Sequence, residues 1–177
     1  MDLLVSADDF NTYLQRPATV DTAQATMALA GASGVVRHFC RWVISEEAPV
    51  TFALDGNGTD ILNLPTLRLN AVSEIRIDGV IVEPGRYEWS RGGQIQLDGW
   101  WPRRFRSIEV DGDHGYATIP DEVRAVVMSL ATRYYINPDG LRSKTVGGVS
   151  RTYMLESASG KPLTELETAM IAGYRIP

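Results

Sequence analysis

The pattern of hydrophobic and polar residues changes period twice along the 177-residue chain. Apolar residues recur every three or four positions before about residue 49 and again after about residue 117, which is typical of helices. Between these parts, short alternating runs are separated by glycine-rich turns, which is typical of antiparallel strands. The pattern therefore predicts helical ends and a β-rich middle.

The first part predicts two helices. Ser6, followed three residues later by an acid, has the spacing of a helix cap and predicts a short helix over residues 7–14. Asp21, followed three residues later by a glutamine, predicts a long helix over residues 22–42. The apolar face expected on the long helix consists of Ala23, Met27, Ala30, Gly34, Val35, His38 and Trp42.

Two glycines lie inside this predicted long helix. Gly31 and Gly34 each cost roughly 1 kcal/mol relative to alanine at a helix-interior position. Close packing against another helix or subunit would explain them, and ordinary core packing is the alternative.

The middle of the chain predicts about seven short strands. Residues 50–54 and 60–64 flank a glycine-rich turn and predict one hairpin, and residues 69–78 and 80–82 flank Asp78-Gly79 and predict a second. Further strands are expected at residues 87–89, 94–97 and 107–110. This number of turn-separated strands predicts a small antiparallel sandwich or barrel.

Helical periodicity returns near the C-terminus. Pro120 precedes two acids and an apolar stripe, which predicts a helix over residues 120–136. Thr164 and Glu167 form a capping box that predicts a last short helix, ending near Gly173.

This order of elements predicts an α+β fold, with a helical core from both chain ends and an inserted small antiparallel β module. The helical core is expected to comprise residues 1–48 and 118–177, and the β module residues 49–117. The two long helices are expected to pack on each other. The residues expected to be buried there are Met27, Val35, Val126 and Leu130.

Composition and charge narrow the possible functions. The chain is 44% hydrophobic and 22% charged, which is ordinary for a globular protein. Its net charge of −5 argues against general adhesion to nucleic acid or to an acidic membrane. The most apolar helical stretch, residues 27–36, is too short to span a membrane, and the first ten residues predict no secretory signal. The single Cys40 excludes an intramolecular disulfide and a multi-cysteine zinc site.

Two groups of residues could carry chemistry. His38 and Cys40 are two positions apart on a predicted helix, so they point in different directions, and His38 is interpreted as a packing residue. Asp111, Asp113 and His114 are potential metal ligands, but the glycines beside them favour a turn at a strand end.

Three glycine-containing segments also lack the residues that a calcium or phosphate site requires. Residues 55–60 resemble the start of an EF-hand loop, but Asp60 and Thr66 occupy positions that require glycine and glutamate. The glycine pairs at 92–93 and 147–148 lack the neighbours of a phosphate-binding loop. No catalytic residue, metal or cofactor is assigned, and no enzyme activity is expected.

Aromatic and basic residues alternate in residues 100–106. Such a segment could stack on single-stranded bases or sugars while its arginines contact phosphates. The simpler interpretation is a tryptophan packed in the β module beside solvated arginines. A third is that either Trp100 or Trp101 anchors a protein interface.

Several segments occur together in a characteristic order. They are Asp9-Phe10, Ala32 to Phe39, Val72 to Gly79, Tyr87, a tryptophan at 100 or 101, Ile108 to Val110, His114 to Tyr116, Ile119 to Arg124, Leu130-Ala131, and Leu163 to Arg175. Their order and spacing resemble the tailed-bacteriophage head-to-tail adaptor family, also called head completion or connector proteins. The resemblance covers nearly the whole chain.

The resemblance implies a structural virion protein at the head–tail interface, synthesised in the host cytoplasm. It implies a homo-oligomeric ring, usually of twelve copies, beneath the portal protein and above the next tail component. Double-stranded DNA would pass through the ring, and an acidic channel wall would hold it weakly. The family has no catalytic residues to transfer. The alternatives are a nucleic-acid-binding module that uses Trp100 to Arg106 and, third, an undetected hydrolase.

Residues 141–153 contain three bases and no acid, together with Gly147-Gly148. They predict an arm that is mobile in the free subunit and becomes ordered on a neighbouring subunit or the portal. A surface loop without a partner is the alternative. The candidate interface residues of the chain are Arg142, Lys144, Val146, Val149, Arg151, Tyr153, Trp100, Trp101, Leu166, Met170 and Tyr174.

Overall fold

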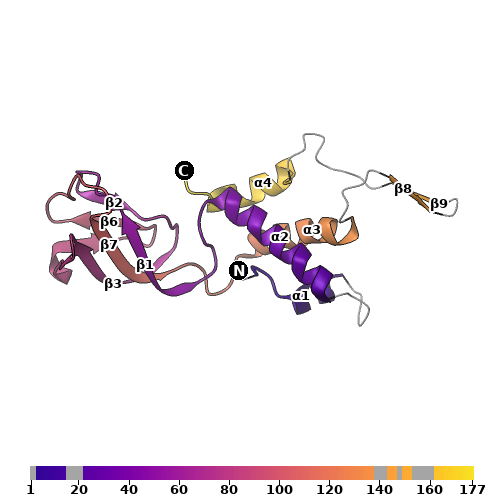
Figure 1. The fold of residues 1–177 in the computed structure, drawn as a ribbon, viewed down its shortest axis with the longest axis horizontal. Helices are drawn as coiled ribbons and strands as arrows, with labels where there is room; N and C mark the ends of the chain where they lie inside the picture. Colours follow the sequence, from indigo (N-terminus) through magenta and orange to yellow (C-terminus); the bar gives the residue numbers. More distant parts are fainter. Residues whose placement is uncertain (1–2, 15–21, 138–142, 147–148, 153–161) are drawn as a thin grey trace. The chain divides into compact units, whose positions relative to one another are not determined.

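The computed structural model describes residues 3–14, 22–137, 143–146, 149–152 and 162–177 (Figure 1). The chain divides into two compact units. A helical unit comprises Met1–Cys40 and Ile119–Arg175, and a β unit comprises Arg41–Thr118 with Ile176–Pro177. The predicted α+β fold is confirmed. The exact division into domains at residues 48/49 and 117/118 stays a prediction.

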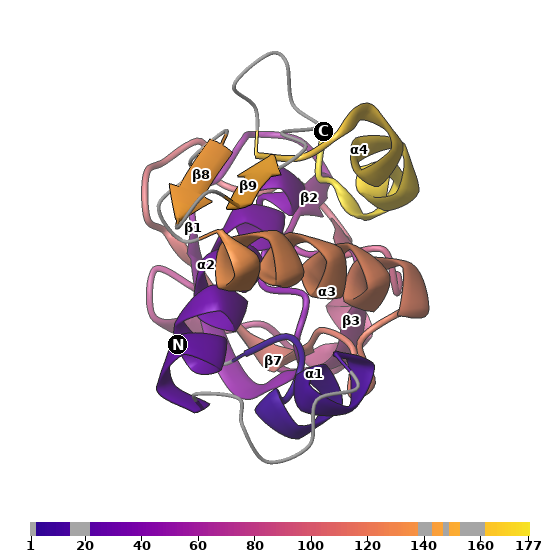
Figure 2. The same cartoon turned by 90° about the vertical axis from the view of Figure 1, so that its right-hand side faces the viewer.

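The helical unit contains four α-helices among its described residues. They are α1 (Ala7–Tyr13), α2 (Thr22–Cys40), α3 (Asp121–Ile136) and α4 (Glu165–Ile171), the last continuing into a 3₁₀ turn at Ala172–Tyr174. Helix α3 packs against both α2 and α4, and α1 packs against α2 (Figure 2). The predicted cap of α1 is confirmed, because Ser6 Oγ accepts a hydrogen bond from the Asp9 N–H at 3.1 Å.

The predicted apolar face of α2 is wrong. Met27 is 76% exposed, and His38 is exposed too and is therefore not a packing residue. The buried residues of α2 are Ala25, Ala28, Leu29, Ala32, Ser33, Val36 and Cys40. This buried stripe consists mostly of small side chains, three of them alanine, and a hydropathy pattern ranks it no higher than the second stripe through Met27. Small side chains here allow α3 to approach closely, and Val126 and Leu130 are buried as predicted.

Helix α2 ends two residues earlier than its apolar pattern predicts. Arg41 has a φ of 68°, in the left-handed region that commonly terminates a helix. Trp42 therefore belongs to the β unit, where it is 5% exposed and its ring centroid lies 6.1 Å from that of Tyr116.

The β unit contains two antiparallel sheets. One has the strand order β1-β7-β3-β4 and the other β2-β6-β5. The strands are β1 (Glu47–Leu54), β2 (Ile61–Asn63), β3 (Leu69–Ile77), β4 (Val80–Ile81), β5 (Tyr87–Trp89), β6 (Gln94–Leu97) and β7 (Ile108–His114). A 3₁₀ turn at Pro84–Arg86 precedes β5.

The first predicted hairpin is wrong and the second is confirmed. Strand β1 pairs with β7, and β2 pairs with β6 in the other sheet. The connection between β1 and β2 is fixed by the Gly56 N–H, which donates to the Arg104 carbonyl at 2.8 Å, and therefore does not close a tight turn. Strands β3 and β4 do form a hairpin, and Asp78 and Gly79 have φ angles of 49° and 81°, as a type I′ turn requires.

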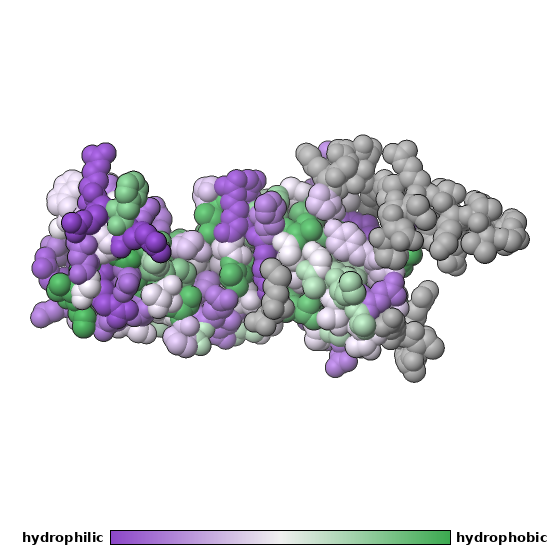
Figure 3. All heavy atoms as spheres, in the orientation of Figure 1, coloured by the Kyte–Doolittle hydropathy of each residue, from purple (hydrophilic) through white to green (hydrophobic). Residues whose placement is uncertain are grey.

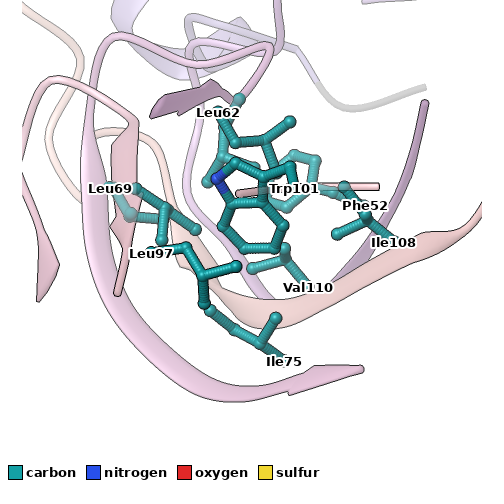
Figure 4. Packing of buried hydrophobic residues seen from close by; sticks show 10 residues of the cluster. Phe52, Leu62, Leu69, Ile75, Leu97, Trp101, Ile108 and Val110 are labelled. Atoms are coloured by element: carbon teal, nitrogen blue, oxygen red, sulfur yellow. The ribbon is translucent and has the colours of Figure 1, made fainter. Parts of the chain in front are cut away.

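The two sheets share one hydrophobic core, drawn in Figure 4. Its largest member is Trp101, which is 1% exposed and whose Nε1–H donates to the Asp60 carbonyl at 3.0 Å. Around it lie residues from both sheets: Phe52, Leu62, Leu64, Leu69, Ile75, Ile95, Leu97, Ile108 and Val110. Residue 101 thus ties the segment before β7 to both sheets.

The contact between α2 and α3 can be tested at one buried position. Leu130→Ala should lower the free energy of unfolding by about 2–5 kcal/mol, because it removes methyl groups from a side chain that is 1% exposed. Met27→Ala on the exposed stripe is the control and should change stability by less than about 0.5 kcal/mol. Urea denaturation of both variants measures the difference. Similar losses at the two positions would contradict the observed orientation of α2.

Candidate interaction surfaces

The cysteine and histidine at the end of α2 do not form a reactive pair. Burial raises the pKa of the Cys40 thiol to about 11, a shift that the nearby Arg175 guanidinium only partly opposes. The thiol is therefore protonated at neutral pH, whereas a nucleophilic cysteine needs the thiolate. His38 is exposed on α2.

The three potential metal ligands near residue 113 lie within β7 and not in the turn that the sequence favours. His114 points into the core, 3.2 Å from Thr66 Oγ1 and 3.4 Å from Glu47. Asp111 and Asp113 lie on the opposite face of the strand, because successive residues alternate. Among the described residues, no three His, Cys, Asp or Glu side chains are grouped to hold a metal ion.

The segment that resembles an EF-hand loop is the connection from β1 to β2. Asn57 Oδ1 accepts hydrogen bonds from the backbone N–H and the hydroxyl of Thr59, at 3.0 and 2.9 Å. Asp55 Oδ1 accepts the backbone N–H of Arg106 at 2.7 Å. These side-chain oxygens thus stabilise the chain path instead of converging on an ion.

The segment of residues 100–106 separates its two tryptophans. Trp101 is buried, as in the simpler interpretation of this segment, whereas Trp100 is 75% exposed. Trp100 forms one wall of two adjoining surface grooves of about 600 Å³ each. Phe105 is 84% exposed, and Arg104 forms an ion pair with Asp78 at 2.9 Å. One tryptophan therefore fixes the loop and the other is presented to solvent.

Helix α4 is firmly anchored and presents two apolar residues. Arg133 donates two hydrogen bonds, at 2.9 and 2.8 Å, to the carboxylate of Glu167, which also completes the capping box with Thr164. Leu166 and Met170, one turn apart, are 72% and 37% exposed. Exposed apolar side chains on an anchored helix suit a protein interface.

Tyr174 lies just beyond α4. Its hydroxyl donates to Glu122 at 3.0 Å, which links the last 3₁₀ turn to the first turn of α3. This candidate interface residue therefore has a contact within the helical unit.

The outward face of the four-stranded sheet is acidic, a feature that sequence reasoning did not identify as a surface. Arg76 on β3 binds the carboxylates of Glu74, Glu109 and Asp111, the last two at 3.0 and 2.6 Å. Asp113 follows on the same side of β7. The signal in the sequence is the alternation of carboxylates at 109, 111 and 113, which period-2 reasoning could have assigned to one face.

The predicted arm contains a β-hairpin. Strands β8 (Ser143–Val146) and β9 (Val149–Thr152) pair antiparallel with each other. Arg142, Tyr153 and Gly147-Gly148 lie outside the described residues. Mobility of the arm in the free subunit and docking on a partner stay predictions.

The remaining surface is mixed in character. Figure 3 shows hydrophilic residues over most of the visible face of the β unit, with apolar residues in small separate areas. Among the described residues, no helix has the length and hydrophobicity needed to cross a bilayer. The described residues present anchored surfaces to solvent. We expect these surfaces to bind other proteins.

Comparison with known proteins agrees with this character. The chain matches the head completion protein family over residues 3–176, and it belongs to that family. Its role is accordingly that of a structural virion protein of the head–tail connection. No curated protein matches the chain.

Three solved structures have the same fold. One is a chain from the neck of an empty gene transfer agent particle computed with C6 symmetry, with a TM-score of 0.66, 17% identity, and coverage of 98% of this chain and 90% of that one. A chain from the virion of the native gene transfer agent particle gives the same values. A chain from the native neck computed with C12 symmetry has a TM-score of 0.58 and 17% identity, covering 99% and 94%.

The two adjacent tryptophans should respond oppositely to truncation. Trp101→Ala should lower the free energy of unfolding by about 3–5 kcal/mol, because it empties the centre of the core and removes the bond to Asp60. Trp100→Ala should change it by less than about 0.5 kcal/mol, since residue 100 is mostly exposed. Thermal and urea unfolding measure both. A large loss for Trp100→Ala would show that it packs within the subunit.

The anchoring of α4 should depend on pH. Burial alone would raise the pKa of Glu167, but hydrogen bonds from Arg133 and Thr164 outweigh it, so the pKa lies below the usual 4.5. A carboxyl whose pKa is lowered by folding contributes stability above its unfolded pKa, and this is lost as pH falls through the folded value. Glu167→Gln, which retains a capping side chain, should therefore cost about 1–3 kcal/mol at pH 7.

The same variant provides the test of the sign. The difference in unfolding free energy between wild type and Glu167→Gln should shrink as the pH falls below about 4.5, where the wild-type carboxyl becomes protonated. Urea denaturation at pH 7 and at lower pH measures it. A difference independent of pH would exclude the charge of Glu167 as the anchor. Glu165→Gln, at an exposed position of the same helix, is the matched control.

Proposed function

We propose that this chain forms a homo-oligomeric ring of twelve subunits at the head–tail interface of a virion. The ring lies beneath the portal protein and above the next tail component, and double-stranded DNA passes through it. The observation that carries the proposal is the family match over residues 3–176. The likeness to neck chains computed with C12 and C6 symmetry supports the ring.

The exposed surfaces are compatible with ring formation. A closed ring uses head-to-tail contacts, so each subunit needs two different surfaces that complement each other. The chain presents exposed apolar residues on separate elements, namely Leu166 and Met170 on α4 and Trp100 and Phe105 beside β7. Their anchoring lowers the entropy lost on association.

Weak contact with DNA is expected of the channel. Phosphate binding requires concentrated lysine and arginine, whereas this chain carries a net charge of −5. The structure does not favour the alternative of a nucleic-acid-binding module at residues 100–106. Trp101 is buried and unable to stack on a base, and Arg104 is paired with Asp78.

The proposed role requires no catalysis. The described candidates for chemistry have structural contacts, as shown by the buried Cys40 thiol and by His114 beside Thr66. The subunit is synthesised in the host cytoplasm and is incorporated when the head is completed. Binding and orientation of neighbouring proteins are then its whole function.

Assembly with the portal tests the proposal. The purified chain is mixed with portal rings of the same particle, and the complex is examined by sedimentation and by cryo-electron microscopy. The expected result is a ring of twelve copies bound to one side of the portal, with only weak binding of duplex DNA at about 0.15 M salt. Absence of portal binding together with strong, salt-dependent DNA binding would overturn the proposal and favour the nucleic-acid module.

A further inference from the structure

Two adjoining grooves on the β unit share the side chain of Trp100. They have volumes of about 600 and 610 Å³, and the residues that line both are Arg86, Leu97, Asp98, Gly99 and Trp100. On one side of Trp100, the Asp98 N–H donates to the Arg86 carbonyl at 2.7 Å. On the other side, the Trp101 N–H donates to the Thr59 carbonyl at 2.8 Å. The backbone is thus fixed on both sides of this exposed tryptophan.

The two grooves differ in chemistry. One, here called the polar groove, is also lined by Asp60, Gly85, Tyr87, Glu88 and Gln96. The other, here called the apolar groove, is also lined by Ile77, Val80, Ile81, Val82 and Glu83. Val80 and Ile81 are 70% and 59% exposed, and Trp100 beside them is 75% exposed. Large apolar side chains gathered at one exposed groove are typical of an interaction site.

The charge of the grooves favours a cationic ligand. Of the described residues that line them, Arg86 carries the one guanidinium, and four carry a carboxylate: Asp60, Glu83, Glu88 and Asp98. The Arg86 guanidinium donates to the Asp98 carbonyl oxygen at 3.1 Å. A nucleic acid would be repelled by this excess of negative charge. A lysine or arginine side chain would be attracted, and it would also gain from contact with the face of an exposed indole.

Strands at the ends of their sheets border both grooves. Strand β4 ends the order β1-β7-β3-β4, and β5 ends the order β2-β6-β5. Strand β4 supplies Val80 and Ile81 to the apolar groove, and β5 supplies Tyr87 and Glu88 to the polar groove. The backbone of an end strand can pair with an added extended segment, whose side chains then enter neighbouring pockets.

An extended protein segment also matches the contrast between the grooves. Its successive side chains point in opposite directions, so alternate residues can meet different surroundings. Apolar residues of the segment would cover Val80 and Trp100, while a lysine or arginine would meet Glu88 and Asp98. A glycan would also stack on Trp100 and bind polar side chains, but it would leave Val80 and Ile81 uncovered. The observations therefore favour a protein ligand.

We infer that the two grooves bind an extended segment of another protein, in which apolar residues alternate with lysine or arginine. Trp100 is the central contact, because it lines both grooves and is held by its neighbours in the chain. The inference goes beyond the proposed ring and does not depend on it, since the binding site lies on the β unit of a single subunit.

A defined peptide tests the site on the full-length chain. The probe is a blocked hexapeptide of alternating lysine and leucine, and binding is followed by the indole N–H signals of the four tryptophans in proton–nitrogen NMR spectra. The signal lost in Trp100→Phe identifies residue 100. Titration should shift this signal and leave that of Trp42, which is buried and lines neither groove. No shift of the Trp100 signal up to about 5 mM peptide would overturn the inference.

Aromatic truncation tests the central contact. Trp100→Ala should weaken binding of the fluorescently labelled peptide, measured by anisotropy, at least about tenfold, because aromatic anchors carry much of the energy of an interface. Phe105→Ala is the matched control, since Phe105 is 84% exposed and lines neither groove, and it should bind as wild type does. Equal affinity of the two variants would overturn the inference. Circular dichroism and thermal unfolding verify that each variant folds.

Charge neutralisation tests the preference for a basic segment. Glu88→Gln with Asp98→Asn should weaken binding at least about fivefold, since two carboxylates of the polar groove are removed. Glu46→Gln with Glu165→Gln makes the same charge change at exposed positions outside both grooves and should leave the affinity unchanged. Equal losses in the two double variants would show general attraction to an acidic chain and would overturn the assignment to the grooves.

Two further probes separate the remaining ligand classes. A hexapeptide of alternating glutamate and leucine should bind at least about tenfold more weakly than the lysine peptide, and equal binding would overturn the preference for a basic segment. A neutral oligosaccharide, maltohexaose, should not shift the Trp100 signal. A shift with the oligosaccharide and none with the lysine peptide would overturn the inference in favour of a glycan. Because these measurements use the free subunit, they succeed or fail independently of ring assembly on the portal.

Discussion

The pairing of strand β7 with both β1 and β3 is the constraint on which the β unit depends. Because side chains alternate, one face of β7 supplies Ile108, Val110 and His114 to the interior and the other supplies carboxylates to the surface. Gly112 permits this pairing, since a Cβ there would lie 2.3 Å from the Ala71 carbonyl oxygen. A single strand thus sets both the hydrophobic core and the acidic outward face.

In the helical unit, side-chain size distinguishes the buried side of α2 from its exposed side. Helix α2 has a stripe of mostly small side chains that packs within the subunit and a second stripe, through Met27, that faces solvent. Helix α2 has 19 residues, of which only Arg37 and His38 are basic and none is acidic. Its charges therefore do little to distinguish its buried side from its exposed side. Gly34 has no atom near enough to require its small size within the subunit.

The sequence predicts well where local chemistry decides the structure. The caps at Ser6 and Thr164 and the Asp78-Gly79 turn depend on neighbouring residues and are found as expected. The pairing of β1 with β7 joins residues far apart in sequence, which no local turn signal specifies. The buried face of α2 likewise depends on how closely α3 approaches. Trp100 and Trp101 are adjacent, so the local sequence does not indicate which of them is buried. The packing of the core decides that it is Trp101.

The elements that present exposed apolar side chains are also anchored by contacts within their own unit, and this matters for assembly. Trp101 fixes the loop that presents Trp100, and the Arg133–Glu167 pair fixes the helix that presents Leu166. Such preorganised surfaces lose little conformational entropy when a partner binds.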